Sequence, residues 1–124
     1  MLGHVSLGVR NLAQAARFYD AALGALGFVR VWTGEDVLGY GEPGRGEKLN
    51  LFERANAGAP GAGFHLAFNA PSRQAVDDFH AAALACGGAD AGAPGVRPHY
   101  GPHYYAAFVL DGDGHKLEAV FQDS

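Results

Sequence analysis

The amino-acid sequence predicts an α+β fold in which two repeated β-α-β-β-β modules form a curved mixed sheet around a central cavity. The first observation is an internal repeat: the offset in numbering from His4 to His65 equals the offset from Phe18 to Phe79. The second is alternation of apolar and polar residues, typical of half-buried strands, interrupted once in each half by helical spacing. We expect a single domain over residues 1–124, with module one at 1–55, a linker at 56–63 and module two at 64–124.

The first module begins with an alternating strand over residues 3–9. Asn11 then stands at a helix N-cap position with Gln14 three residues later, which is the spacing of a capping box. Apolar residues recur at helical spacing as far as Gly27, a natural C-cap. Three further strands are expected at residues 28–32, 37–40 and 48–52.

The second module repeats this order after the Gly-, Ala- and Pro-rich linker. A strand over residues 64–68 is followed by Ser72, an N-cap residue directly after a proline. The helix that follows ends at the pair Gly87 and Gly88. The offset in numbering from Gly27 to Gly88 equals the offset from His4 to His65. The helix of module two is therefore expected to match that of module one residue for residue.

The chain closes with an Asp-Gly-Asp-Gly turn at residues 111–114 and an alternating strand as far as Phe121. The offset from Asn50 to Glu118 equals the offset from Tyr40 to Phe108, and both are larger than the offset from His4 to His65. Module two thus carries seven additional residues (68 minus 61), which fall within residues 92–105. Glu118 is a carboxylate in a largely apolar strand, and burying it is costly unless it is paired or binds a metal.

The alternation assigns the residues of the outer strands to two faces. One set is expected to pack beneath the helices: Val5, Leu7, Val9, Phe64, Leu66, Phe68, Leu117, Ala119 and Phe121. The other set is expected to face the hollow of the sheet: His4, Ser6, Asn50, Phe52, His65, Ala67, Glu118 and Val120. His4, His65 and Glu118 therefore occupy repeat-related positions on the concave face.

Two imidazoles and a carboxylate that converge on a pocket are the ingredients of a metal site with open coordination positions. We accordingly predict that His4, His65 and Glu118 bind a divalent metal ion. The alternative is that the two histidines are ordinary strand residues and that Glu118 pairs with one of them. The sequence favours the metal site because all three residues fall at related points of the repeat.

The additional stretch, residues 97–105, carries two of the six histidines and three of the five tyrosines. Its prolines lower the entropic cost of holding these side chains over a cavity. We predict catalytic roles for His99 and Tyr105, since an imidazole titrates near neutral pH. The residues predicted to bind substrate are Trp32, Asn50, Phe52, His103 and Tyr104. Alternatively the stretch is a surface loop whose tyrosines cover the core, and Arg97 is either a substrate contact or, as the sequence favours, a solvated charge.

Composition excludes some classes of partner. The net charge of −4 gives no electrostatic reason to bind nucleic acid or an anionic membrane. No apolar run approaches the roughly 18 residues needed to span a membrane, and no basic-then-apolar leader is present. Cys86 is the single cysteine and cannot form an internal disulfide. We therefore expect a cytoplasmic protein whose partner is a small-molecule substrate.

The chain resembles the vicinal oxygen chelate superfamily, which includes glyoxalase I, extradiol dioxygenases, fosfomycin-resistance enzymes and bleomycin-binding proteins. The resemblance covers the paired modules, the opening strand His4-Val5-Ser6-Leu7, the helix phrase Ala16-Arg17-Phe18-Tyr19 and the closing phrase that runs from Asp111 to Glu118. It places the metal positions at His4, Asn50, His65 and Glu118. Glyoxalase I has a carboxylate or glutamine where this chain has Asn50, whereas the extradiol set of His, His and Glu is complete.

The resemblance implies a small glyoxalase- or dioxygenase-like metalloenzyme, a lyase or a dioxygenase, that chelates its substrate through vicinal oxygens. The ion would be Fe(II), Mn(II), Zn(II) or Ni(II). The alternative is a metal-free drug-binding or resistance protein of the same fold, a change of role suggested by Asn50. Members of the superfamily often form homodimers, so a homodimer is also expected, with sites that can be completed between chains.

Overall fold

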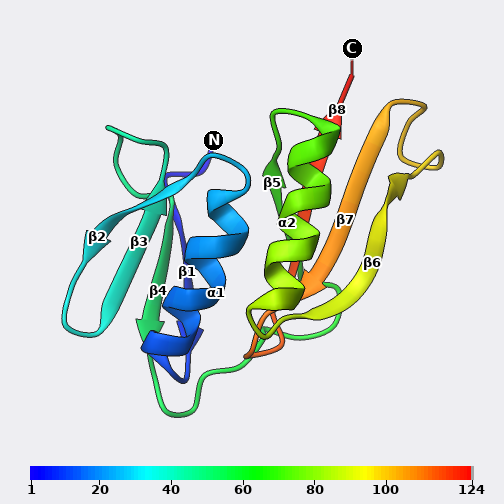
Figure 1. The fold of residues 1–124 in the computed structure, drawn as a ribbon. Helices are drawn as coiled ribbons and strands as arrows, with labels where there is room; N and C mark the ends of the chain where they lie inside the picture. The colour runs from blue at the N-terminus through cyan, green and yellow to red at the C-terminus, as the bar shows by residue number, and fades with distance from the viewer. Residues whose placement is uncertain (124) are drawn as a thin grey trace.

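The computed structural model describes residues 1–123 and contains both expected modules (Figure 1). Module one comprises β1 (Val5–Val9), α1 (Leu12–Gly24), β2 (Val29–Thr33), β3 (Val37–Gly41) and β4 (Leu49–Glu53). Module two comprises β5 (Leu66–Asn69), α2 (Arg73–Ala85), β6 (Ala89–Val96), β7 (Tyr104–Leu110) and β8 (Lys116–Gln122). The predicted α+β class and the repeated β-α-β-β-β order are confirmed.

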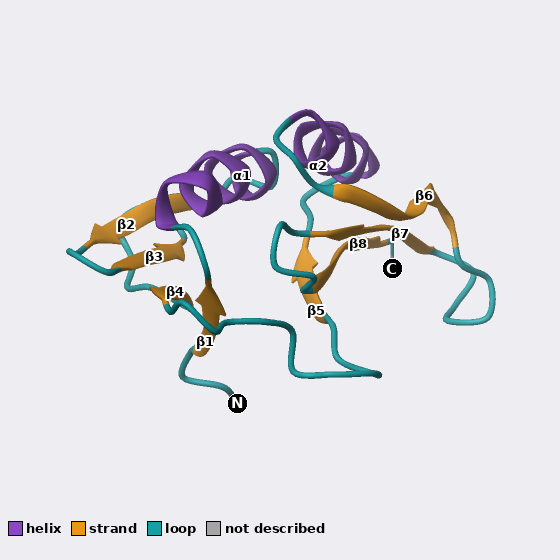
Figure 2. Ribbon diagram, turned by 90° about the horizontal axis from the view of Figure 1, so that it is seen from below, coloured by secondary structure: helices purple, strands orange, loops and turns teal. Residues whose placement is uncertain are grey.

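Each module forms its own four-stranded mixed sheet, in the orders β1-β4-β3-β2 and β5-β8-β7-β6. The first strand of each module pairs in parallel with the last, so that Ser6 lies opposite Asn50 and Ala67 lies opposite Glu118. Figure 2 shows the two sheets side by side beneath the two helices, with β1 and β5 on the facing edges. Within one chain, residues 1–123 therefore form two separately hydrogen-bonded sheets rather than the single curved sheet that the sequence led us to expect.

Both helices begin where the sequence predicts. Asn11 Oδ1 accepts a hydrogen bond from the backbone N–H of Gln14 at 2.9 Å, and Ser72 Oγ accepts one from the N–H of Ala75 at 3.0 Å. These side chains satisfy amides that the first turn of a helix leaves without partners. In residues 1–123, neither helix has the length and apolar character needed to cross a membrane.

The ends of the helices correct one detail of the repeat. Left-handed glycines follow them at Gly27, with φ of 91°, and at Gly87, with φ of 94°. Only glycine adopts this conformation without strain, so these two residues are equivalent. The constant offset had paired Gly27 with Gly88, so the left-handed glycine comes one residue earlier in module two than the sequence predicted.

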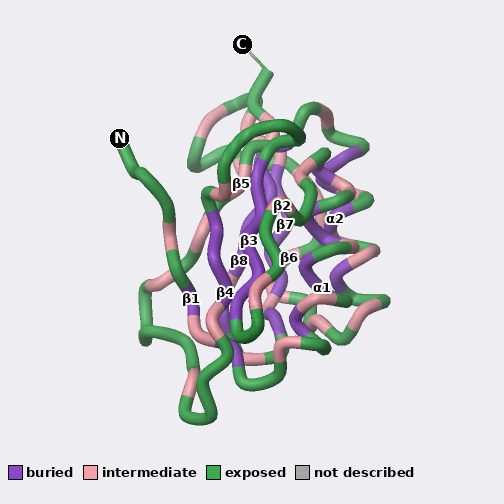
Figure 3. Tube along the Cα trace, turned by 90° about the vertical axis from the view of Figure 1, so that its left-hand side faces the viewer, coloured by how far each residue is buried: buried purple, intermediate pink, exposed green. Residues whose placement is uncertain are grey.

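The main apolar core lies between the sheets and the helices. Leu7, Val9, Leu117 and Ala119 are buried in it, and the other five residues expected beneath the helices pack against it: Val5, Phe64, Leu66, Phe68 and Phe121. Figure 3 shows the buried residues concentrated along the central strands and the inner faces of the helices. The two-residue period of the strands thus assigned the helix-facing side correctly.

The alignment of the middle strands, however, shifts by one residue. Gly39 lies opposite Asn50, and Phe108 lies opposite Glu118, so Phe108 corresponds to Gly39 rather than to Tyr40. The chain between these paired residues is one residue shorter in module two, which accounts for the shift. Tyr40 instead points toward α1, where its hydroxyl donates to Asp20 Oδ1 at 2.7 Å.

Candidate functional site

Glu118 lies at the centre of the concave face of module two, with a side chain only 2% exposed. His65, directly before β5, places Nε2 at 3.0 Å from Glu118 Oε1. The hydroxyl of Tyr104 on β7 donates to the other carboxylate oxygen. Both oxygens are therefore engaged, as a buried carboxylate requires. Glu118 and Tyr104 lie on the adjacent strands β8 and β7, and His65 directly precedes β5, which pairs with the other side of β8.

The environment of Tyr104 keeps its hydroxyl protonated. Burial raises the pKa of Tyr104, and the hydrogen bond to the negative Glu118 raises this pKa further, well above its ordinary value. At neutral pH the phenol is thus a proton donor directed at Glu118. Tyr104 thus supplies a hydroxyl at the carboxylate from β7, the strand next to β8.

Module one carries the counterpart of this arrangement, but it is incomplete. Asn50 is 5% exposed, and its Oδ1 atom has no hydrogen-bond partner among the described residues. A Cβ atom at Gly39 would lie 3.0 Å from this oxygen and 3.2 Å from Cβ of Trp32. Leaving a buried carbonyl unpaired costs about 1–3 kcal/mol. Asn50 Oδ1 is therefore a buried acceptor without a partner among residues 1–123.

His4 is exposed, in contrast to Glu118. It precedes β1 at the edge of module one, and no hydrogen bond holds its side chain among the described residues. His4, His65 and Glu118 do not form a cluster of ligand atoms within residues 1–123 of one chain. The structure thus brings together two of the three predicted metal ligands and leaves the third free.

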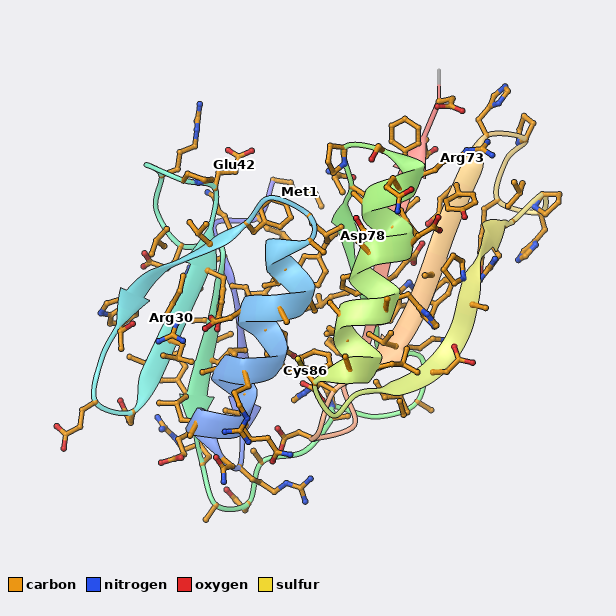
Figure 4. The ribbon with its side chains drawn as sticks, in the orientation of Figure 1. Met1, Arg30, Glu42, Arg73, Asp78 and Cys86 are labelled. Atoms are coloured by element: carbon orange, nitrogen blue, oxygen red, sulfur yellow. The ribbon has the colours of Figure 1, made fainter. Side chains whose placement is uncertain are left out.

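The residues of the 97–105 stretch separate into two groups. His99 stacks on Tyr100 with ring centroids 4.1 Å apart, and Tyr100 approaches Tyr104 with centroids 5.2 Å apart, so His99 extends the concave face. Tyr105 points the other way, toward α2: its hydroxyl donates to Asp77 at 2.6 Å, and Arg73 lies 4.9 Å from its ring centroid. Figure 4 shows Arg73 at the start of α2. Tyr105 therefore packs against the helix layer, away from Glu118.

Two other predicted substrate contacts are less constrained. His103 is exposed. Phe52 is half-buried on the concave side of β4, where the guanidinium of Arg54 lies 5.4 Å from its ring centroid.

One cluster of potential metal ligands was not singled out in the sequence. Asp111, Asp113 and His115 place ligand-type atoms within 4.8 Å of one another, the single such group among the described residues. Asp111 Oδ1 accepts from the backbone N–H groups of Asp113 and His115, and Oδ2 accepts from Tyr19 at 2.5 Å and from His115 Nδ1 at 2.8 Å. These four hydrogen bonds occupy the carboxylate.

This cluster is consequently a joint between the modules rather than an open metal site. Burial raises the pKa of Asp111, but the hydrogen bonds from His115 and Tyr19 outweigh it, so this pKa lies below its usual value. Arg10, in module one, binds Asp113 at 2.8 Å and the carbonyl of Gly112 at 3.0 Å. The Asp-Gly-Asp-Gly sequence signals the turn, but not the burial of His115.

Two cavities lie outside the surroundings of Glu118. A groove of about 430 Å³ follows the seam between the modules, lined mainly by apolar residues that include Val5, Phe28, Leu66 and Phe68. A smaller one of about 140 Å³ lies beside the Asp111 turn and Cys86. Neither is lined by His65 or Glu118.

The fold and the site define a protein of paired β-α-β-β-β modules with imidazole and carboxylate donors on the inner strands. The sequence matches the model of the Glyoxalase/Bleomycin resistance protein/Dioxygenase superfamily over residues 1–119. A glyoxalase/bleomycin resistance protein from Albidiferax ferrireducens has 34% identity and a TM-score of 0.85, with 99% of each chain covered. The chain therefore belongs to this superfamily.

More distant structures share the fold. A glyoxalase-related enzyme from Fulvimarina pelagi has 22% identity and a TM-score of 0.76, covering 98% of this chain and 88% of its own. A fosfomycin resistance protein from Listeria monocytogenes has 17% identity and a TM-score of 0.72, covering 99% of this chain and 93% of its own. No curated protein matches the sequence.

Proposed function

We propose that this chain is a metal-dependent enzyme of the glyoxalase or dioxygenase kind, with His65 and Glu118 as two of its metal ligands. The observation that carries the proposal is the convergence of an imidazole and a carboxylate, 3.0 Å apart, beside the apolar cluster of Ala106, Phe108 and Val120. Imidazole nitrogen and carboxylate oxygen together suit Fe(II), Mn(II), Zn(II) and Ni(II). A divalent ion there polarises neighbouring oxygens of a substrate and stabilises the charge that develops on them.

The third ligand is His4, supplied by a second copy of the chain in a homodimer. Among residues 1–123 of its own chain His4 has no hydrogen-bond partner, and there β1 and β5 present unpaired edges. The same pairing would bring Asn50, with its unpaired oxygen, next to a substrate bound at Glu118. A second copy thus completes the set of donors and covers the open concave face.

The chain's own residues supply the remaining functions. Tyr104 holds its proton at neutral pH and is directed at the carboxylate, so it can donate to an oxygen of the substrate that displaces this contact. His99, whose ring centroid lies 4.1 Å from that of Tyr100, is placed to contact the substrate from the same face. Asn50 and Trp32 orient the substrate from module one.

A second candidate is a metal-free protein that sequesters a small molecule. It is favoured by one observation: His65 and Tyr104 already engage both oxygens of Glu118, so the carboxylate is stable without a metal. In that case the hollow holds its ligand through aromatic contacts and hydrogen bonds alone.

Metal binding separates the two candidates. The chelator-treated protein should bind at least one of the four ions with a stoichiometry near one per chain, measured by calorimetry and elemental analysis. The substitution His4→Gln should abolish binding without lowering stability, because His4 is exposed. Glu118→Gln should also abolish it, whereas Glu35→Gln, distant from the site in the β2–β3 turn, should leave it unchanged. Failure of all four ions to bind the wild-type protein would refute the enzyme proposal and favour the sequestering protein.

A further inference from the structure

Two cationic side chains share one aromatic ring on the concave face of module two. The guanidinium carbon of Arg97 lies 5.5 Å from the ring centroid of Phe108, and Nζ of Lys116 lies 5.0 Å from the same centroid. The His65 ring meets Phe108 edge-on, with centroids 6.0 Å apart. Phe108 is thus the floor of a small, positively charged surface next to Glu118.

Neither cation is paired with an acidic side chain in the part of the chain that the structure describes. Other arginines form ion pairs: Arg10, Arg30, Arg45, Arg54 and Arg73. Arg97 and Lys116 have no carboxylate within 4.0 Å among the described residues, in a chain with 13 acidic side chains. Glu118 is already bonded to His65 and Tyr104. Both cations lie within 5.5 Å of the same ring centroid, so an anion close to that ring is attracted to both.

Arg97 is held in place, contrary to the solvated charge favoured by the sequence. Its Nη1 donates to the carbonyl of Gly95 at 3.0 Å, and its Nη2 donates to the carbonyl of Ala93 at 2.7 Å. A Cβ atom at Gly95 would lie 3.2 Å from Nη1, and one at Gly92 would lie 3.3 Å from Nη2, so both glycines leave room for the guanidinium. A guanidinium has more N–H donors than these two hydrogen bonds use, so donors remain for a ligand. Because the two bonds already order the Arg97 side chain, ligand binding costs less conformational entropy.

We infer that Arg97 and Lys116 form a subsite for the oxyanion group of a small organic acid, a carboxylate or a phosphonate, seated over Phe108. The inference rests on the proposed function for one point, that the rest of the ligand extends toward His65 and Glu118. The planar N–H groups of the Arg97 guanidinium suit the oxygens of a carboxylate or a phosphonate. The ammonium of Lys116 adds a second positive charge. The same charges disfavour a cationic drug as the ligand.

An NMR titration of the metal-free protein tests the subsite separately from the metal. The probes are pyruvate, methylphosphonate and the neutral compound hydroxyacetone. We expect saturable shifts of backbone amides around Arg97 and Lys116 with at least one of the two anions, and none with hydroxyacetone. Binding should weaken as salt is added, because added ions screen the attraction. The tighter of the two anions identifies whether the group is a carboxylate or a phosphonate.

Variants locate the binding. Arg97→Gln and Lys116→Gln should each weaken anion binding by about tenfold or more, the loss expected for a charged hydrogen bond. Arg17→Gln is the matched control, since Arg17 is an exposed cation on α1, and it should bind as the wild type does. The Lys116 side chain makes no hydrogen bond to the backbone of residues 1–123, so its variant tests the subsite even where Arg97→Gln disturbs β6.

The outcomes of this test and of the metal test are distinct. Equal affinity for pyruvate and hydroxyacetone, no binding of either anion, or wild-type affinity in both variants would overturn the subsite. Anion binding that depends on Arg97 and Lys116 in a protein that binds none of the four metal ions would uphold the subsite and refute the metalloenzyme.

Discussion

At the scale of single residues, the chemistry depends on how the protein accommodates Glu118. A carboxylate 2% exposed in a strand of apolar residues is stable only with partners, and the sequence predicted that it would have them. It also identified His65 from the repeat and named Tyr104. It could not show that Tyr104 rather than Tyr105 faces Glu118, because the register of β7 against β8 depends on the length of the turn between them.

Replacing Glu118 with glutamine should lower the pKa of Tyr104. Burial of the phenol remains, but the negative charge and the hydrogen bond that disfavour the phenolate are lost. Ultraviolet absorbance of tyrosinate across an alkaline titration measures this pKa, and subtraction of the curve for Tyr104→Phe assigns it. If the difference curve is the same with and without Glu118, the contact does not exist in solution.

At the scale of elements, the sequence predicted the parts that local rules govern. The N-caps Asn11 and Ser72 were correct because a capping side chain reaches only its own first turn. The faces of the outer strands were correct because their period is two. The equivalence of Phe108 with Tyr40 was wrong, since a single residue of difference in a turn moves every side chain on the strand to the other face.

The contact between the helices makes a prediction at this scale. A Cβ atom at Gly88 would lie 2.6 Å from Cε1 of Phe18 on α1 and 2.8 Å from the carbonyl oxygen of Ala83. Gly88→Ala should therefore lower the free energy of unfolding by about 1–3 kcal/mol, as overpacked cores do. Gly24→Ala is the control: its Cβ meets nothing within 4 Å, and alanine is the better helix former, so stability should stay equal or rise. Urea unfolding measures both, and equal midpoints would show that Gly88 is not packed against α1.

At the scale of the whole molecule, the sequence could not predict how the modules sit together. The periodicity of strands and helices describes each module by itself, whereas their placement depends on contacts such as Tyr19 with Asp111, distant in the sequence and buried only in the fold. The result is a shared helix layer, two separate sheets and a joint at the Asp111 turn. In residues 1–123 of one chain, β1 and β5 remain edge strands of the two sheets.

Acid should weaken the joint between the modules. The folded pKa of Asp111 lies below its unfolded value, so this carboxylate contributes stability that is present above about pH 4 and is lost as the pH falls through the folded pKa.

Asp111→Asn should cost about 2–4 kcal/mol at neutral pH, because a buried acceptor of several bonds is disrupted. It should also flatten the dependence of stability on pH below pH 4. Asp36 forms an exposed ion pair with Arg54, so Asp36→Asn should change the free energy of unfolding by no more than about 1 kcal/mol and leave its pH dependence unchanged. A wild-type slope in Asp111→Asn would assign the acid sensitivity to other carboxylates.

The completion of the metal site by a second copy can be tested by mixing two inactive chains. His4→Ala and Glu118→Ala should each bind no metal, since each lacks one donor at every site. A mixed dimer pairs the intact His4 of one chain with the intact His65 and Glu118 of the other, so an equal mixture should recover about a quarter of the wild-type metal capacity, by the symmetry of a two-fold dimer. A site built within one chain predicts no recovery at any ratio, because every chain in the mixture lacks one of its own donors. Elemental analysis of dimers isolated with a different affinity tag on each chain distinguishes the two arrangements.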